Sequence, residues 1–353
     1  MSMPEREEPC TIAWDAETEC IVYIDQTLLP GRYELMRCAT VDDLARAIGR
    51  LEIRGAPALG IAGAMGVALA AVRSTETDLG RFFEEIGLAA DLLKSTRPTA
   101  VNLAWGIGRV QRKIALAASI AEAKAIAVAE ANTVAEEDEL TCRRIGGFGA
   151  ELFPERCTVL THCNAGALAC RCWGTALGVI RSAVAVGKDV RVIACETRPL
   201  NQGSRLTCWE LARDEIDVTL IPDSSAAYLM RKGMIDLIVV GADRITKDAV
   251  FNKIGTYMHA VAAHHHSIPF YVAAPVSTFD LSHRETDITV EERDRSELAY
   301  CGDRKLVPDD VKVLNYAFDA TPLDLVDGIV TEIGVLRPPY EKSFRLVGKD
   351  REN

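Results

Sequence analysis

The chain has 353 residues, of which 48% are hydrophobic and 26% charged, the balance of a soluble globular protein rather than of a disordered or fibrous one. Its formal net charge of -11, without a long run of Lys or Arg, disfavours nucleic acid and anionic membranes as partners. The length alone predicts two domains.

The cysteines and the amino terminus indicate the compartment. Eleven cysteines are spread from Cys10 to Cys301, and several lie in apolar runs, as Cys195 does in VRVIACE. An odd number in such positions favours reduced thiols over a disulfide framework. The amino-terminal MSMPEREEPC is acidic and polar, unlike a signal peptide, and no apolar run reaches transmembrane length. We therefore expect a cytoplasmic protein.

The amino-terminal part predicts a hairpin followed by helices. Residues 11–25 contain two β-leaning stretches, TIAW and CIVYI, separated by the turn-like DAETE. From Val41 to about Gly146 the apolar residues recur with a helical period, and the last of these segments is long and rich in Ala and Glu. We predict a first domain, residues 1–146, made of this hairpin and a set of helices.

After Pro154 short β-branched stretches alternate with helical segments. These stretches are CTVLTH, VRVIAC, DVTLIP, DLIVVGAD and PFYVAAP. The alternation predicts a Rossmann-like α/β domain over residues 147–353, with an open and mainly parallel sheet. Ligands bind such sheets beyond the carboxyl ends of the strands, so the residues after each strand are the candidates for function.

The first of these strands is followed by THCNAGALA, which places His162 and Cys163 at the strand's end. A thiol near the N–H groups of a helix amino terminus has a lowered pKa and reacts as a thiolate. The alternative is an inert buried cysteine, which is the commoner role of this residue. The residues alone leave both interpretations open.

The loop after the second strand, ETRPLNQGSRLT, carries the donors Arg198, Gln202 and Arg205 ahead of an apolar helix. Such donors suit phosphate and hydroxyl groups, although a solvated surface loop has the same composition. In the first domain, RGAPALG places Arg54 before a helix with Pro57 in its first turn, an arrangement whose free N–H groups attract anions. Arg97, in STRPTAVNL, is a second candidate cation.

The fourth strand ends in LIVVGADRI, so Asp243 follows a strand expected to be buried on both faces. A carboxyl group in that position often has a raised pKa and donates a proton near neutrality. A helix N-cap or a salt bridge to Arg244 is an equally good interpretation. Shortly afterwards Asn252 and Lys253 precede an apolar helical stretch, where they could hold a ligand oxygen.

Two tempting features do not predict a metal site or a nucleotide site. The histidines at residues 264–266 are consecutive, so on a helix they point in different directions, and Cys170 and Cys172 lack a second cysteine pair. The glycines that recur every third residue from Gly60 lack both a preceding strand and the spacing of a dinucleotide loop. They favour close packing between helices.

Six motifs occur in order along the chain: RGAPALG, RPTAVNLAW, THCNAGALA, ETRPLNQGSRLT, GADRI and NKIGTY. Together they resemble the methylthioribose-1-phosphate isomerases. The resemblance extends over roughly residues 10 to 340, and the shorter TKDAVFNKIGTY form is similar to archaeal members. Many bacterial members have Asp where this chain has Cys195. The family shares its fold with the regulatory subunits of translation initiation factor 2B and with ribose-1,5-bisphosphate isomerases.

The resemblance implies a role for each matched residue. It assigns catalysis to Cys163 and Asp243, and it implies a homodimer that binds a small sugar phosphate and needs no metal or other cofactor. The implied reaction converts 5-methylthioribose 1-phosphate to 5-methylthioribulose 1-phosphate in methionine salvage. Substrate contacts are assigned to Arg54, Gly55, Ala56, Arg97, Gln202, Asn252 and Lys253.

Two other functions fit the same resemblance. The first is isomerisation of 5-deoxyribose 1-phosphate or of ribose 1,5-bisphosphate, although a second phosphate would need another basic cluster that the sequence does not reveal. The second is a non-catalytic regulatory subunit related to initiation factor 2B. Such a subunit need not keep both Cys163 and Asp243, and this chain has both.

Overall fold

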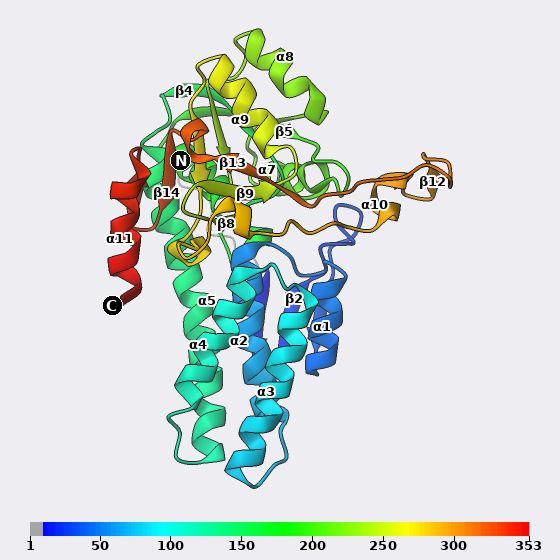
Figure 1. Ribbon diagram of the computed structural model, residues 1–353, viewed down its shortest axis with the longest axis vertical. Helices are drawn as coiled ribbons and strands as arrows, with labels where there is room; N and C mark the ends of the chain where they lie inside the picture. Colours follow the sequence, from blue (N-terminus) through cyan, green and yellow to red (C-terminus); the bar gives the residue numbers. More distant parts are fainter. Residues whose placement is uncertain (1–9, 353) are drawn as a thin grey trace. The chain divides into compact units, whose positions relative to one another are not determined.

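The computed structural model describes residues 10–352 and divides the chain into two compact units (Figure 1). The first unit runs to Arg144 and also includes Ala165–Gly178. The second contains Ile145–Asn164 and continues from Val179. The chain therefore leaves the second unit directly after Asn164 and returns to it at Val179.

The first unit begins with a small antiparallel sheet in the order β1-β2-β3. Its strands are β1 (Ile12–Asp15), β2 (Cys20–Ile24) and β3 (Leu35–Cys38). The hairpin predicted from TIAW and CIVYI is confirmed as β1 and β2. Strand β3 was not predicted, because three of its four residues are exposed and give no apolar alternation.

Five helices follow, as the helical period predicted: α1 (Val41–Gly49), α2 (Ala56–Arg73), α3 (Leu79–Thr96), α4 (Val101–Ile114) and α5 (Ile120–Ala150). The side chains of Thr40 and Asp78 cap α1 and α3 by accepting backbone N–H groups. Where α2 crosses α4, a Cβ on Gly106 would lie only 2.0 Å from the Gly60 carbonyl oxygen. The predicted close packing at these glycines is therefore confirmed.

Helix α2 is long and apolar enough to cross a membrane by the criteria of length and composition, which the sequence analysis did not expect. However, 83% of its 18-residue window is buried inside the fold. Met65 and Leu69 belong to the same apolar core as Phe82, Leu93 and Ile107 of α3 and α4. Packing against these helices accounts for its composition, as in the core helix of a soluble protein.

The second unit is built on a seven-stranded sheet in the order β15-β14-β10-β7-β4-β5-β6. All neighbours pair in parallel except β15, which is antiparallel to β14, so the predicted mainly parallel sheet is confirmed. The strands are β4 (Arg156–Thr161), β5 (Asp189–Cys195), β6 (Val218–Ile221), β7 (Leu237–Val240), β10 (Phe270–Ala273), β14 (Gly328–Thr331) and β15 (Gly334–Leu336).

Helices connect or flank these strands: α6 (Ala176–Ala185), α7 (Cys208–Arg213), α8 (Ala226–Arg231), α9 (Thr256–His265) and α11 (Tyr340–Glu352). A second, three-stranded sheet has the order β13-β9-β8 and consists of β8 (Arg244–Ile245), β9 (Ala249–Lys253) and β13 (Phe318–Pro322). Helix α10 (Arg295–Ala299) precedes a short hairpin of β11 (Tyr300–Cys301) and β12 (Arg304–Lys305).

The order of the strands reverses beside β4. From β4 the chain adds β5 and then β6 on one side, and it then crosses to add β7 and β10 on the other side of β4. The loops that follow β4 and β7 therefore leave neighbouring strands in the same direction. In open α/β sheets such a switch point opens a crevice where ligands bind.

Candidate active site

Cys163 lies just beyond the carboxyl end of β4, in a left-handed backbone conformation with a φ of 64°. Its N–H donates to Thr197 Oγ1 at 2.8 Å, and its carbonyl accepts from Thr207 Oγ1 at 2.6 Å. Two hydroxyl groups from the segment after β5 thus hold both backbone polar groups of the cysteine. A residue with a side chain rarely adopts this conformation, and such strain concentrates at functional sites.

The segment after Cys163 differs from the prediction. Only a short 3-10 turn (Ala167–Ala169) follows, and α6 begins at Ala176, so the expected helix amino terminus does not come directly after the cysteine. Trp173 and Gly174 have positive φ angles of 65° and 87°, which a helix cannot contain. The predicted position of the Cys163 thiol directly before a helix amino terminus is therefore wrong.

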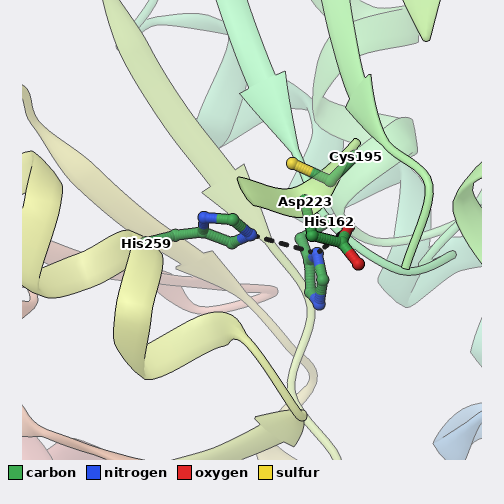
Figure 2. Close-up of side chains that lie close together, drawn as sticks. All are labelled: His162, Cys195, Asp223 and His259. Carbon is green, nitrogen blue, oxygen red and sulfur yellow. Dashed lines mark hydrogen bonds and ion pairs between the residues drawn. The ribbon is translucent and has the colours of Figure 1, made fainter. Parts of the chain in front are cut away.

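Two buried histidines, His162 and His259, lie close together beside Cys195 and Asp223 (Figure 2). His162 Nε2 is 2.8 Å from the Ile254 carbonyl, which can only accept, so this nitrogen carries the hydrogen. His162 Nδ1 then accepts from His259 Nε2 at 3.2 Å. Burial lowers the pKa of His162 to about 4 and that of His259 to about 3. The pair is neutral at pH 7, with one hydrogen on each ring.

Asp223 connects this pair with the loop that holds Cys163. Its Oδ1 lies 3.8 Å from His162 Nδ1 and accepts the Thr197 N–H at 2.7 Å, while Oδ2 accepts the Arg198 N–H at 2.8 Å. Because Thr197 in turn accepts from the Cys163 backbone, Asp223 helps to fix the position of the cysteine. Sequence reasoning missed Asp223, although it follows β6 and the strand-end rule applies to it.

The same region contains a set of groups that could hold a metal ion. Ligand atoms of His162, Cys195, Asp223 and His259 all lie within 4.8 Å of one another, and two imidazoles, a thiol and a carboxylate are donors that suit zinc. Burial raises the pKa of Cys195, however, which keeps its sulfur protonated. The histidines and Asp223 already hydrogen-bond within the protein. The set comes from four separate segments, so spacing in the sequence did not reveal it.

Asp243 follows β7, the neighbour of β4 in the sheet, and its N–H donates to the Phe251 carbonyl at 2.9 Å. The chain then continues into β8, so the N-cap interpretation is wrong. Arg244 lies 3.6 Å from Asp280, which gives that guanidinium a carboxylate partner on another segment. Cys163 and half-buried Asp243 therefore occupy the two loops that flank the switch point of the sheet.

Asn252 and Lys253 lie on the buried strand β9, where the sequence had placed them only before a helix. Asn252 Nδ2 donates to Thr256 Oγ1 at 3.0 Å. Lys253 Nζ donates to the Ala317 carbonyl at 2.9 Å and stands 4.6 Å from the centre of the Phe318 ring. A cavity beside Lys253 measures about 10 Å³, room for about one water molecule and not for a sugar phosphate.

Asp319, on β13 opposite Asn252, was missed by sequence reasoning. Its carboxylate accepts the N–H of Gly255 at 2.7 Å and that of Tyr257 at 3.2 Å, at the amino terminus of α9. Burial raises its pKa to about 6, against the effect of these N–H groups and of Lys253. A carboxyl group that titrates near neutrality thus lies on the same small sheet as Asn252 and Lys253.

Gln202 is 5% exposed and begins the turn that leads into α7. Within residues 10–352 its side-chain oxygen has no hydrogen-bond partner. A buried acceptor in that state suits a hydroxyl or N–H group of a ligand. The two neighbouring arginines hydrogen-bond to backbone carbonyls of their own loop. Arg205 Nε donates to the Leu200 carbonyl at 3.1 Å, and Arg198 donates to the Pro199 carbonyl at 3.0 Å.

The remaining predicted residues belong to the first unit. Arg54 is 8% exposed, and its Nε donates to Gln26 Oε1 at 2.9 Å. Gly55 is the N-cap of α2 with a φ of 96°, and a Cβ there would lie 2.5 Å from the Ala169 backbone, so only glycine fits. Ala56 begins the helix, as the sequence predicted. Arg97 lies at the end of α3.

Comparison with known proteins identifies the family of the chain. The sequence profile of the initiation factor 2 subunit family matches residues 52–338. The chain belongs to that family. A relative from Archaeoglobus fulgidus, named a putative methylthioribose-1-phosphate isomerase, is 55% identical over 96% of this chain and 99% of its own length. A relative from Moorella thermoacetica, named 5-deoxyribose 1-phosphate isomerase, is 48% identical over 96% of this chain and 98% of its own length.

Solved structures of family members have the same fold. The structure of 5-methylthioribose 1-phosphate isomerase from Pyrococcus horikoshii is 38% identical, with a TM-score of 0.90 over 99% of both chains. A structure from A. fulgidus, described as the delta subunit of translation initiation factor eIF-2B, is 54% identical, with a TM-score of 0.86 over 97% of this chain and 100% of that one. The resemblance to the isomerase family is thus confirmed.

Proposed function

We propose that this protein is an aldose–ketose isomerase that converts 5-methylthioribose 1-phosphate to 5-methylthioribulose 1-phosphate in methionine salvage. The observation that carries the proposal is the placement of Cys163 and Asp243 in the two loops that flank the switch point of the sheet. An acid and a thiol at that edge can act on adjacent atoms of one bound sugar. The relatives named as methylthioribose-1-phosphate isomerases support the substrate.

The substrate's chemistry explains why an acid is needed. A sugar phosphorylated on its anomeric oxygen cannot open to a free aldehyde and keep its phosphate. In our mechanism the protonated carboxyl of Asp243 donates to the ring oxygen as the bond from that oxygen to C1 breaks. Hydrogen then moves from C2 to C1, the C2 hydroxyl releases its proton to water to leave the ketone, and the Asp243 carboxylate takes a proton back from water.

The hydrogen has two possible routes from C2 to C1. Cys163 as a thiolate takes it as a proton through an enediol-like intermediate, or it shifts directly as a hydride while Cys163 stabilises charge. Turnover in deuterated water distinguishes the two routes. Deuterium at C1 of the product supports the proton route, and its complete absence supports the hydride shift.

Each unit offers groups for substrate binding. In the first, Arg54 and the N–H groups at the start of α2 suit an anion, and the resemblance adds Arg97. In the second, the unpaired oxygen of Gln202 suits a sugar hydroxyl, and Asn252 and Lys253 supply donors. These assignments predict that Gln202→Leu raises KM more than it lowers kcat, because a uniform binding contact is lost.

The direct test is turnover of three sugar phosphates by the purified protein: 5-methylthioribose 1-phosphate, 5-deoxyribose 1-phosphate and ribose 1,5-bisphosphate. We expect the highest kcat/KM with the methylthio compound. Preference for the deoxy compound would favour the second candidate, which the Moorella relative supports. Conversion of none would favour a regulatory role, as the description of the A. fulgidus structure suggests.

A further inference from the structure

Four cysteines of the first unit form two pairs in different surroundings. The Sγ atoms of Cys10 and Cys172 are 3.2 Å apart, and both residues are half-buried. Cys142 and Cys170 are buried, and their Sγ atoms lie within 4.8 Å of each other and of Asp138. A small solute can therefore reach the first pair more easily than the second.

Hydrogen bonds hold in place the residue that follows Cys10 and the residue that precedes Cys172. Thr11, next to Cys10, donates its N–H to the Arg171 carbonyl at 2.9 Å and its hydroxyl to the Ala167 carbonyl at 2.8 Å. Arg171, next to Cys172, donates its own N–H to Asp138 on α5 at 2.7 Å. These bonds keep the two sulfur atoms closer than ordinary van der Waals contact.

The two thiols of this pair are not equivalent. Cys172 donates a hydrogen bond to the Cys10 sulfur, and this bond, with the nearby Arg171 guanidinium, lowers the pKa of Cys10. The same bond raises the pKa of Cys172. Glu139 opposes ionisation of both sulfurs without reversing this order. Cys10 is therefore suited to be the attacking thiolate, and Cys172 is suited to be the resolving thiol.

We propose that Cys10 and Cys172 form a peroxide-responsive pair that closes reversibly to a disulfide. The Cys10 thiolate attacks hydrogen peroxide, the O–O bond breaks, and with one proton taken up the products are Cys10 sulfenic acid and water. The Cys172 thiol then attacks the sulfenic sulfur, forms the S–S bond and releases a second water. Peroxide is the oxidant, and a small dithiol restores both thiols.

A disulfide between Cys10 and Cys172 would stabilise the first unit, and the buried pair Cys142 and Cys170 provides an internal control. It would tie the start of the β1–β2 hairpin to the Ala165–Gly178 segment, and it would restrict the unfolded chain over the whole loop from residue 10 to residue 172. The buried pair should not respond, because burial and the contact with Cys170 raise the pKa of Cys142 well above its ordinary value.

The test treats the reduced, full-length protein with stepwise equivalents of hydrogen peroxide, followed by intact-mass analysis and peptide mapping without reductant. We expect a loss of two hydrogen atoms per chain, a peptide that joins Cys10 to Cys172, full reversal by dithiothreitol, and a higher unfolding temperature for the oxidised form. The Cys172→Ser variant should instead accumulate Cys10 sulfenic acid that dimedone labels.

Matched variants make the outcome decisive. Cys301→Ser removes an exposed cysteine outside the pair and should leave the cross-link unchanged, whereas Cys10→Ser should abolish it. Circular dichroism and unfolding temperature establish that each variant is folded. The proposal is overturned if the folded wild type gains oxygen at Cys301 or at other cysteines before any Cys10–Cys172 cross-link forms, or if Cys10→Ser and wild type lose thiols equally.

Discussion

The two loops at the switch point hold their candidate residues by different means. Around Cys163, the hydroxyl groups of Thr197 and Thr207 hold the backbone, and the Asp223 carboxylate holds Thr197 in turn. Asp243 donates its N–H to Phe251 of the second, smaller sheet, and that sheet also contains Lys253 and Asp319, a carboxyl group whose pKa is raised. We infer that the first region fixes the geometry of the thiol and that the second region controls charge at the site. The predictions below test this division of roles.

The largest effect is expected at the thiol itself. Cys163→Ala removes the sulfur and should lower kcat by about 10²–10⁴-fold, the range typical of a lost acid–base group. Cys163→Ser keeps the shape and should be impaired nearly as much if the thiolate is the base. Steady-state kinetics measure both. Cys208→Ser, at another partly buried cysteine, is the control and should leave kcat unchanged.

The histidine pair predicts loss of stability in acid. Below pH 6.5 the unfolded chain protonates both imidazoles, whereas the folded protein keeps them neutral down to about pH 4. The unfolded state then binds more protons, so the free energy of unfolding falls as the pH drops through this window.

His259→Gln keeps a donor for His162 and removes one titrating group. We expect its acid-induced loss of stability to be smaller than that of the wild type by about 1–3 kcal/mol. Urea unfolding at several pH values measures this difference. His265→Gln, on the exposed end of α9, should behave like the wild type. Equal acid profiles for His259→Gln and wild type would contradict a neutral buried pair.

A smaller effect is expected at Thr197, whose hydroxyl accepts from the Cys163 backbone and donates to the Cys195 carbonyl. Thr197→Val leaves that N–H without its acceptor, at a cost of about 1–3 kcal/mol shared between stability and the orientation of the thiol. We expect kcat to fall about tenfold. Thr197→Ser keeps the hydroxyl and should restore activity. If both variants have the same kcat, this hydrogen bond does not position Cys163.

The smallest effect is expected at Asp319. Its folded pKa of about 6 lies above the ordinary value of 3.8, so the folded protein holds the proton that the unfolded chain has lost, and stability falls as the pH rises from about 4 to 6. Asp319→Asn removes this dependence, a change on the order of 1 kcal/mol for a partly exposed group. Urea unfolding across this range, with exposed Asp324→Asn as control, measures it. A constant difference from wild type would refute the raised pKa.

Much of the fold could be predicted because its long elements have clear patterns. The five predicted strands and the amino-terminal helices have β-branched runs or helical periods that stand out locally. Strands β8 and β9 are short and pair with each other, and β9 also pairs with the distant β13, so Asn252 and Lys253 were placed before a helix and not on a strand. Nor can periodicity show that Ala165–Gly178 packs with the first unit.

The sequence predicted the site residues that follow recognisable strands and missed those that act through distant contacts. The strand-end rule and the family motifs singled out Cys163 and Asp243, because each follows a recognisable buried strand. His259 and Asp319 gave no such signal, since their roles come from contacts with residues far away in the sequence, such as that between His259 and His162. The sequence therefore did not reveal the residues that surround the catalytic candidates Cys163 and Asp243.

The most direct test of the account is a single turnover of 5-methylthioribose 1-phosphate by wild type and by Asp243→Asn, with substrate binding measured separately by calorimetry. Asn keeps the size of Asp243 but cannot supply an acidic proton. We predict nearly unchanged affinity and a rate of ketose formation, followed by NMR, that falls by about 10²–10⁴-fold. Ketose formation at the wild-type rate by Asp243→Asn would contradict the assignment of the acid and, with it, the division of roles between the two loops.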